Sequence, residues 1–186
     1  HALKVGKLPD AVIGDLDSLD PATRAAIPPE RVHHITEQDS TDFDKALRHV
    51  SAPVILALGF LGARLDHELA AYHTLVAHPG RFCILIGPVD IVLHVPPALD
   101  LMLPPGTRFS LFPMQTVRGT SLGLEWPIDG MTFHPATRIG TSNRVTEGPV
   151  SLRMEGPGML LILPRAHLEA VLTALLPQDP TGSGAD

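Results

Sequence analysis

Cysteine is almost absent from this sequence of 186 residues, because Cys83 is the only one. A lone cysteine excludes a disulfide framework within the chain and agrees with a reducing compartment, so we expect the cytoplasm. Long apolar runs are lacking as well. The longest, residues 53–61, is about half of the ~20 residues that a membrane-spanning helix needs. The sequence therefore predicts a protein that does not cross a membrane.

Basic residues are also few. Lys and Arg number 14 against 20 Asp and Glu, and the net charge is −6. A nucleic-acid-binding protein normally presents a basic face, so we expect no nucleic-acid partner. The 10 histidines show no HExxH pattern and have no cysteine partners, so they do not predict a zinc site.

The first half of the chain alternates strand-like and helix-like patterns. Helical patterns cover residues 21–26, 41–50 and 65–77, and Ser40 and Thr41 offer N-cap hydroxyls to the second. Strands that alternate with helices favour a mainly parallel sheet, so we predict an α/β domain over residues 1–96. The strands are indicated by short apolar runs at residues 10–14, 31–35, 53–58 and 82–86, the third apolar throughout, as in a strand covered on both faces.

The pattern changes near Pro96 and Pro97. Regularly spaced short strands separated by Gly or Pro predict a β-sandwich over residues 97–176, closed by a helix at residues 166–176. Residues 177–186 are rich in Gly and Ser, so we expect a mobile tail. The strand-like segments of the second half are residues 109–112, 121–126, 131–133, 150–154 and 159–163.

Two aspartates follow the first predicted strand. Residues two apart on an extended chain point to the same side, so Asp15 and Asp17 can present both carboxylates to one point, with Leu16 turned into the core. Two facing carboxylates repel each other unless a cation lies between them. Oxygen ligands without Cys or His favour a hard ion such as Mg²⁺. The alternative is a turn in which the Asp side chains accept hydrogen bonds from backbone N–H groups.

A second polar segment follows the next strand. Thr41, Asp42 and Lys45 lie within one helical turn near a helix start, where anions bind favourably and a lysine suits phosphate oxygens. Asp42 would be a further metal ligand or the base for an incoming hydroxyl. The alternative is ordinary capping, with acidic residues that complement the helix dipole.

The third segment, residues 59–67, joins the third strand to the next helix. Its glycines let the backbone approach a ligand closely, and Arg64 is able to hold a phosphate with two hydrogen bonds. Asp66 would accept from a hydroxyl or orient Arg64. An Arg–Asp pair that caps the helix is the alternative. All three segments lie at the carboxyl ends of strands, where ligands of open parallel sheets gather.

These segments resemble the signatures of the thiamine pyrophosphokinase family. The match consists of PDAVIGDLDS ending at residue 18, QDSTDFDKAL at residues 38–47, GARLDH at residues 62–67 and GTSN at residues 140–143. It spans roughly residues 8–163 in the family's order. The resemblance implies an α/β fold with a Rossmann-like, mainly parallel N-terminal domain followed by a β-sandwich. It also implies a homodimer whose sites are shared between subunits.

The family's activity is the transfer of a pyrophosphoryl group from ATP to the hydroxyl of thiamine, with AMP as the other product. The resemblance implies that Mg²⁺ is held by the catalytic residues Asp15, Asp17 and Asp42. It implies that ATP is surrounded by Ser18, Thr41, Lys45, Arg64 and Asp66, and that thiamine is contacted by Gln38, Ser142 and Asn143.

The only tryptophan, Trp126, is expected in the core of the sandwich. An aromatic face for the cationic thiazolium ring of thiamine is the alternative.

The sequence departs from the family pattern in three places, one of which is the C-terminal helix and tail from Ala166, to which the resemblance assigns no counterpart. The family carries a further strand and an Asp-Gly-Gly loop before the first signature, and this chain begins after them, so we expect one ligand to be missing. Ala63 stands where a second glycine is usual. Two other functions stay open: pyrophosphoryl transfer to another alcohol such as a hydroxymethyl-pterin, and a non-catalytic module that binds thiamine or a nucleotide. The GTSN segment argues against the pterin.

Overall fold

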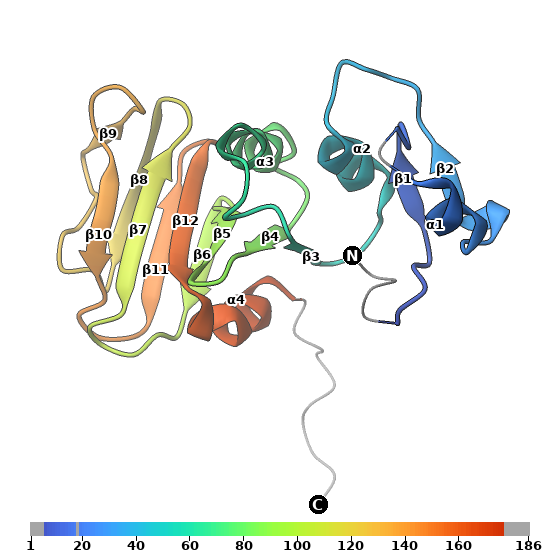
Figure 1. Cartoon of the computed structure of the whole chain (residues 1–186). Helices are drawn as coiled ribbons and strands as arrows, with labels where there is room; N and C mark the ends of the chain where they lie inside the picture. The colour runs from blue at the N-terminus through green and yellow to red at the C-terminus, as the bar shows by residue number, and fades with distance from the viewer. Residues whose placement is uncertain (1–5, 18, 177–186) are drawn as a thin grey trace, which may run out of the picture. The chain divides into compact units, whose positions relative to one another are not determined.

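The computed structural model describes residues 6–17 and 19–176, shown in Figure 1. The predicted tail at residues 177–186 and Ser18 therefore lie outside the described residues. The chain divides into two compact units, His1–Ser51 and Ala52–Asp186, which are described separately.

Over its described residues, 6–17 and 19–51, the first unit contains a parallel pair of short strands, two short α-helices and a 3₁₀ turn. Val12 of one strand lies opposite Val32 of the other. The longest helix begins at Asp42 because the Thr41 side chain accepts a hydrogen bond from the Asp44 N–H at 3.2 Å. These findings confirm the predicted strands, the helical turn and the N-cap. The elements are β1 (Val12–Gly14), α1 (Pro21–Ala25), a 3₁₀ turn (Pro29–Arg31), β2 (Val32–His34) and α2 (Asp42–His49).

The second unit contains a six-stranded mixed sheet in the order β10-β7-β12-β5-β4-β3. Only β3 and β4 run parallel, because a helical crossover joins them, whereas the tight turn between β4 and β5 makes that pair antiparallel. The expected mainly parallel sheet is therefore limited to the pairs β1–β2 and β3–β4. The strands are β3 (Ile55–Leu58), β4 (Cys83–Ile86), β5 (Asp90–His94), β7 (Arg108–Pro113), β10 (Gly140–Arg144) and β12 (Met159–Pro164).

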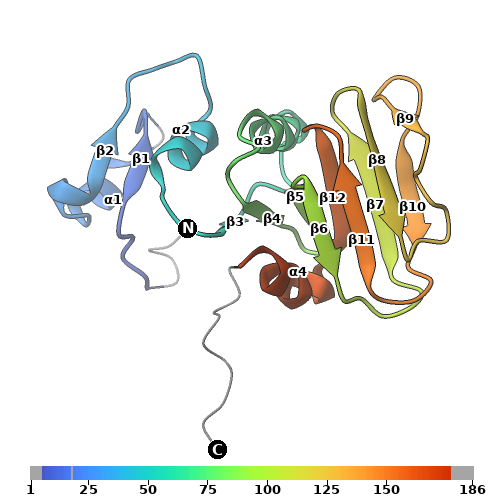
Figure 2. The ribbon, with the colours of Figure 1, turned by 180° about the vertical axis from the view of Figure 1, so that it is seen from behind.

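A four-stranded antiparallel sheet in the order β6-β11-β8-β9 completes this unit (Figure 2). Alternating residues of both sheets contribute to one apolar core, among them Leu93 and Phe109 of the six-stranded sheet and Leu152 of the four-stranded one. The elements are β6 (Ala98–Leu101), β8 (Val117–Leu122), β9 (Thr132–Phe133) and β11 (Val150–Met154), followed by a 3₁₀ turn (Arg165–His167) and α4 (Leu168–Leu175).

Helix α3 (Leu65–Ala77) has the predicted bounds and packs against β5 and β12. No helix among the described residues is long and apolar enough to cross a membrane. Strands from both sides of residue 96 share the six-stranded sheet, while the compact units separate after Ser51. The boundary at residue 96 stays a prediction.

Strand β3 is not covered on both faces, contrary to the sequence prediction. Leu56 and Leu58 are 43% and 64% exposed in this strand. The strand lies at the edge of the six-stranded sheet, and Leu56 and Leu58, two residues apart, point to the same face, which is exposed. The predicted strand at residues 121–126 is also displaced, because β8 covers Val117–Leu122.

Candidate functional site

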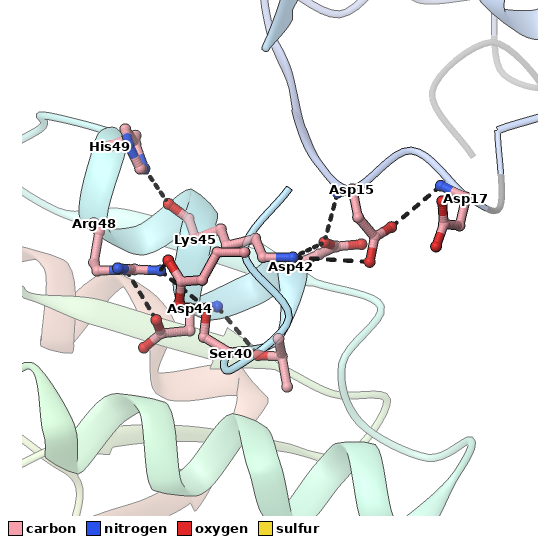
Figure 3. A network of polar contacts seen from close by, with 10 residues as sticks. Asp15, Asp17, Ser40, Asp42, Asp44, Lys45, Arg48 and His49 are labelled. Atoms are coloured by element: carbon pink, nitrogen blue, oxygen red, sulfur yellow. Dashed lines mark hydrogen bonds and ion pairs between the residues drawn. The ribbon is translucent and has the colours of Figure 1, made fainter. Parts of the chain in front are cut away.

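The acidic loops of the first unit meet at a buried lysine (Figure 3). The Nζ atom of Lys45 lies 3.4 Å from Asp42 Oδ1 and 3.8 Å from Asp15 Oδ2. The Lys45 side chain is only 1% exposed, whereas those of Asp15 and Asp42 are 25% and 54% exposed. The sequence analysis predicted a cation between Asp15 and Asp17, whereas in the structure the carboxylates that share a cation are those of Asp15 and Asp42, and the cation is the Lys45 ammonium group. We call Asp15, Asp42 and Lys45 the carboxylate–lysine cluster.

Backbone geometry brings β1 close to α2. The Asp15 N–H donates to Asp42 Oδ1 at 3.3 Å. A Cβ atom on Gly14 would lie 2.7 Å from the same oxygen, so only glycine leaves room for Asp42 at this position. The strand end and the helix start therefore converge on one carboxylate.

The loop after β1 is a turn and not an extended segment. Leu16 has a φ of 64°, and the Asp17 N–H donates to Asp15 Oδ1 at 3.2 Å. The same-side argument for Asp15 and Asp17 is therefore wrong, since it required an extended chain, and the alternative of an Asp side chain that accepts from the backbone is what the structure contains. Asp17 is exposed on this turn.

The cluster provides two hard oxygen donors for a metal ion. Among residues 6–17 and 19–176, no group of three or more His, Cys, Asp or Glu side chains is arranged to hold a metal. Mg²⁺ is usually bound by one or two protein carboxylates, with phosphate and water oxygens as the remaining ligands. The carboxylates of Asp15 and Asp42 fit that pattern, although Lys45 now lies between them.

A network of ion pairs holds the loop that precedes α2. The Arg48 guanidinium lies 2.9 Å from Glu37 and 3.0 Å from Asp44, and it donates to the Ser40 hydroxyl at 2.9 Å. The hydrogen bond from the Ser40 hydroxyl, with help from Arg48, lowers the pKa of Glu37. Gln38 is exposed on the loop that this network fixes.

The loop after β3 holds Arg64 and Asp66 as an exposed pair. Arg64 donates to Asp66 through Nε at 3.1 Å and through a terminal nitrogen at 2.5 Å. The pKa of Asp66 is lowered to about 2, and the main cause is the hydrogen bond from Arg64. The Gly62 N–H donates to the Glu68 carboxylate at 2.9 Å. In this structure the glycine backbone that was expected to approach a ligand is therefore hydrogen-bonded to a side chain of the same chain.

The GTSN segment forms β10, which the sequence did not predict as a strand. Ser142 has a φ of 63° at an irregularity in the β10–β7 pairing, and its N–H donates to Ser110 Oγ at 2.9 Å. The buried Asn143 amide donates to the Trp126 carbonyl at 2.7 Å and accepts from the Trp126 N–H at 3.2 Å. Asn143 therefore fixes the backbone of Trp126.

Trp126 is 52% exposed, so its expected position in the core is wrong. It borders a pocket of about 350 Å³ in the second unit. Sequence reasoning missed most of this pocket because its walls come from separate turns and strands. The nearness of residues 138 and 139 to the GTSN segment was the only local signal. The lining residues that the sequence analysis did not single out include Ile128, Met131, Phe133, Arg138 and Ile139.

The predicted site residues thus form three groups. The first unit holds the carboxylate–lysine cluster, with Asp17 beside it, Thr41 as the cap of α2, and Gln38 exposed on the loop before that helix. The second unit holds the Arg64–Asp66 pair on one loop. It also holds Ser142 and Asn143 beside the Trp126 pocket.

Two family models match the chain in succession. Residues 1–84 match "Thiamin pyrophosphokinase, catalytic domain", and residues 90–157 match "Thiamin pyrophosphokinase, vitamin B1 binding domain". Thiamine pyrophosphokinase 3 of rice is 28% identical over 75% of this chain and 59% of its own length. Thiamine pyrophosphokinase 1 of Arabidopsis thaliana is 25% identical over 79% of this chain and 62% of its own length. The chain thus spans about three fifths of these relatives.

Solved structures share the fold. Thiamine pyrophosphokinase from Bacillus subtilis superposes with a TM-score of 0.67 at 22% identity, covering 88% of this chain and 81% of that one. The yeast enzyme gives a TM-score of 0.68 at 18% identity, covering 87% of this chain and 71% of its own. These similarities concern the fold.

Proposed function

Because the chain belongs to the thiamin pyrophosphokinase family, we propose that it transfers a pyrophosphoryl group from ATP to thiamine, releasing AMP. The observation that carries this proposal is the succession of a catalytic-domain match and a vitamin B1 binding-domain match on one chain. The carboxylate–lysine cluster in the first part and the Trp126 pocket in the second would supply the chemistry of these two domains.

The cluster would bind the metal and the polyphosphate. Asp15 and Asp42 would hold Mg²⁺, with Asp17 as a further ligand on the adjacent turn. The bound ion would neutralise charge on the phosphates and polarise the phosphorus under attack. Lys45, already held between both carboxylates, would interact with phosphate oxygens. Asp42 is half exposed and would accept the proton of the thiamine hydroxyl when it does not bind the ion.

The family's signatures assign nucleotide contacts to the loop after β3 and, separately, to the start of α2. Arg64, which is exposed, would exchange part of its bonding with Asp66 for phosphate oxygens. Asp66 would keep the guanidinium oriented. Thr41 and Ser18 would contribute hydroxyls. These roles follow from the family's signatures.

Thiamine would bind in the Trp126 pocket. The exposed indole offers its face to the cationic thiazolium ring. Because the Asn143 amide is engaged with the Trp126 backbone, we assign Asn143 to positioning that ring. Ser142 and Gln38 are exposed and would contact the substrate directly.

The proposal includes the domain division and the assembly. The two family matches meet between residues 84 and 90, which supports an α/β part up to about residue 96, a β-sandwich at residues 97–176 and a final tail. A homodimer with shared sites would combine the cluster of one subunit with the Trp126 pocket of its partner. The single, buried thiol of Cys83 agrees with the cytoplasm.

The decisive assay measures AMP release from ATP and Mg²⁺ with thiamine, with a hydroxymethyl-pterin, and without an acceptor alcohol. We expect AMP release only in the reaction that contains thiamine as the acceptor. AMP release with the pterin would favour the other acceptor, and tight thiamine binding without AMP would favour a non-catalytic module.

A mixing experiment tests the shared site. Asp17→Asn chains, and chains in which Ser142 and Asn143 are both alanine, should each be inactive, but in a heterodimer one site carries both defects and the other carries none. Re-equilibrated mixtures should regain up to about a quarter of wild-type activity if exchange is random. Heterodimers without activity would contradict the shared geometry.

A further inference from the structure

A second apolar pocket lies in the second unit, apart from the residues assigned to thiamine and ATP. It has a volume of about 480 Å³ and lies between the loop that follows α3, the end of β5 and the turn that joins β11 to β12. Its two ionisable residues among the lining side chains are His94 and Glu155. The remaining walls are formed by Pro79, Phe82, Val95, Pro97, Met154 and Pro157, with two glycines.

His94 is the one buried polar side chain in that lining, with 8% exposure. Its Nε2 accepts a hydrogen bond from the Gly158 N–H at 2.9 Å. An imidazole nitrogen that accepts from an amide carries no proton, so in the neutral ring the proton is on Nδ1. Burial lowers the pKa of His94, which favours the neutral ring. The Nδ1 atom of His94 therefore carries the proton and can donate a hydrogen bond.

The structure also shows where this donor is accessible. Among the described residues, no hydrogen-bond partner of His94 Nδ1 is present, and no fully buried side-chain nitrogen or oxygen atom is left without a partner. Nδ1 must consequently be reachable from outside, and the space that His94 borders is this pocket. A buried donor that opens into an apolar cavity is the arrangement of a small-molecule site, in which a few polar groups orient a mostly apolar ligand.

We propose that this pocket binds a neutral, mainly apolar ring compound whose single carbonyl oxygen accepts a hydrogen bond from His94 Nδ1–H. The Glu155 carboxylate at the pocket disfavours anions. Burial against the apolar walls is most favourable for a ring without further polar groups, because the rest of its surface is then apolar. The inference does not depend on the proposed pyrophosphoryl transfer, because none of the lining residues belongs to that site.

The glycines of the pocket provide a way to fill it without disturbing the fold. A Cβ atom on Gly156 meets no atom within 4 Å, and its φ lies outside the left-handed region. Gly156→Leu should therefore fold normally, and because Gly156 is one of the lining residues, we expect its larger side chain to narrow the cavity. His94→Met removes the ring donor, supplies no other donor, and leaves a thioether sulfur as a weak acceptor for the Gly158 N–H.

The test compares two probes of nearly equal shape, 1-indanone, which has a ketone oxygen, and indane, which has none. Both are titrated into the full chain and followed by amide chemical shifts. We expect saturable binding of 1-indanone with a Kd of about 0.1–1 mM, as for efficient ligands of this size. The Gly156 and Gly158 amides should shift. Indane should bind about fivefold more weakly, the value of one net hydrogen bond.

The variants distinguish binding in this pocket from non-specific binding elsewhere on the protein. Gly156→Leu should weaken the binding of 1-indanone at least tenfold with an unchanged melting temperature, and His94→Met should remove the preference for the ketone. His33→Gln, a change at an exposed histidine that does not line the pocket, should bind both probes like the wild type. The proposal is overturned if neither probe saturates, if Gly156→Leu binds 1-indanone normally, or if the wild type does not distinguish the two probes.

Discussion

Replacing Asp42 by asparagine should destabilise the start of α2 by an amount that the geometry of the cluster sets. Lys45 Nζ lies 3.4 Å from Asp42 and 3.8 Å from Asp15, and its side chain is almost fully buried. At an effective dielectric constant of about 40, between a protein surface and bulk water, charges at about 3.4 Å attract with about 2.4 kcal/mol. Asp42→Asn removes the closer partner and leaves the ammonium buried beside Asp15 alone. We expect a loss of about 2 kcal/mol.

Lys45→Met should cost less than Asp42→Asn. It removes both ion pairs, but it also removes the buried charge and keeps a side chain of similar length, so the loss should be about 1 kcal/mol. In the double variant, the change at residue 42 should add little, because no ammonium is left for Asp42 to pair with. The coupling between the two positions is therefore about 1.5–2 kcal/mol.

Hydrogen exchange of the α2 amides measures these losses locally, and about 2 kcal/mol corresponds to exchange about 30-fold faster. Asp39→Asn is the matched control, since it makes the same chemical change at an exposed residue of the neighbouring loop. The reasoning is refuted if Asp42→Asn exchanges no faster than Asp39→Asn, or if the effects at residues 42 and 45 add without coupling.

Three further results are expected. Because Arg64 lowers the pKa of Asp66 to about 2, the pair stabilises the fold above about pH 4, and this contribution is lost as the pH falls through about 2. In Arg64→Ala, the Asp66 pKa measured by carbon NMR titration should return towards its usual ~3.9, and an unchanged value would contradict the pairing. Trp126→Ala should weaken thiamine binding about 5- to 30-fold by calorimetry and leave ATP affinity unchanged; equal losses for both ligands would speak against the thiazolium contact. Asn143→Ala should lower the unfolding free energy by about 1–3 kcal/mol in urea, because the Trp126 N–H and carbonyl lose their partner, while Ser142→Ala, at an exposed side chain, serves as control.

Local patterns predicted the helices well because their hydrogen bonds join residues close in sequence. Thr41 caps α2 through Asp44, three residues away, and α3 covers the predicted Leu65–Ala77. Four family signatures were likewise readable, since each is a continuous segment. The family membership that they indicated is confirmed by the two family models.

Strands were predicted less well where only pairing with a neighbouring strand, and no local sequence pattern, makes the segment extended. The polar segment Gly140–Arg144 shows no apolar alternation, yet it forms β10 by pairing with β7. Strands β5 and β6 were also missed. The order of the six-stranded sheet depends on pairs such as His94 with Leu160, far apart in the chain, which no local period encodes.

The sequence by itself determined which side chains we propose for the chemistry: two aspartates after β1, Asp42 and Lys45 on one turn of α2, and an arginine with an aspartate after β3. Only the tertiary structure decided how they are used. It buried Lys45 between Asp15 and Asp42, turned the chain at Leu16 and exposed Trp126 through its bonds to Asn143. The physical reason is that residue type sets charge and hydrogen-bonding capacity, whereas burial and pairing depend on contacts between segments distant in sequence.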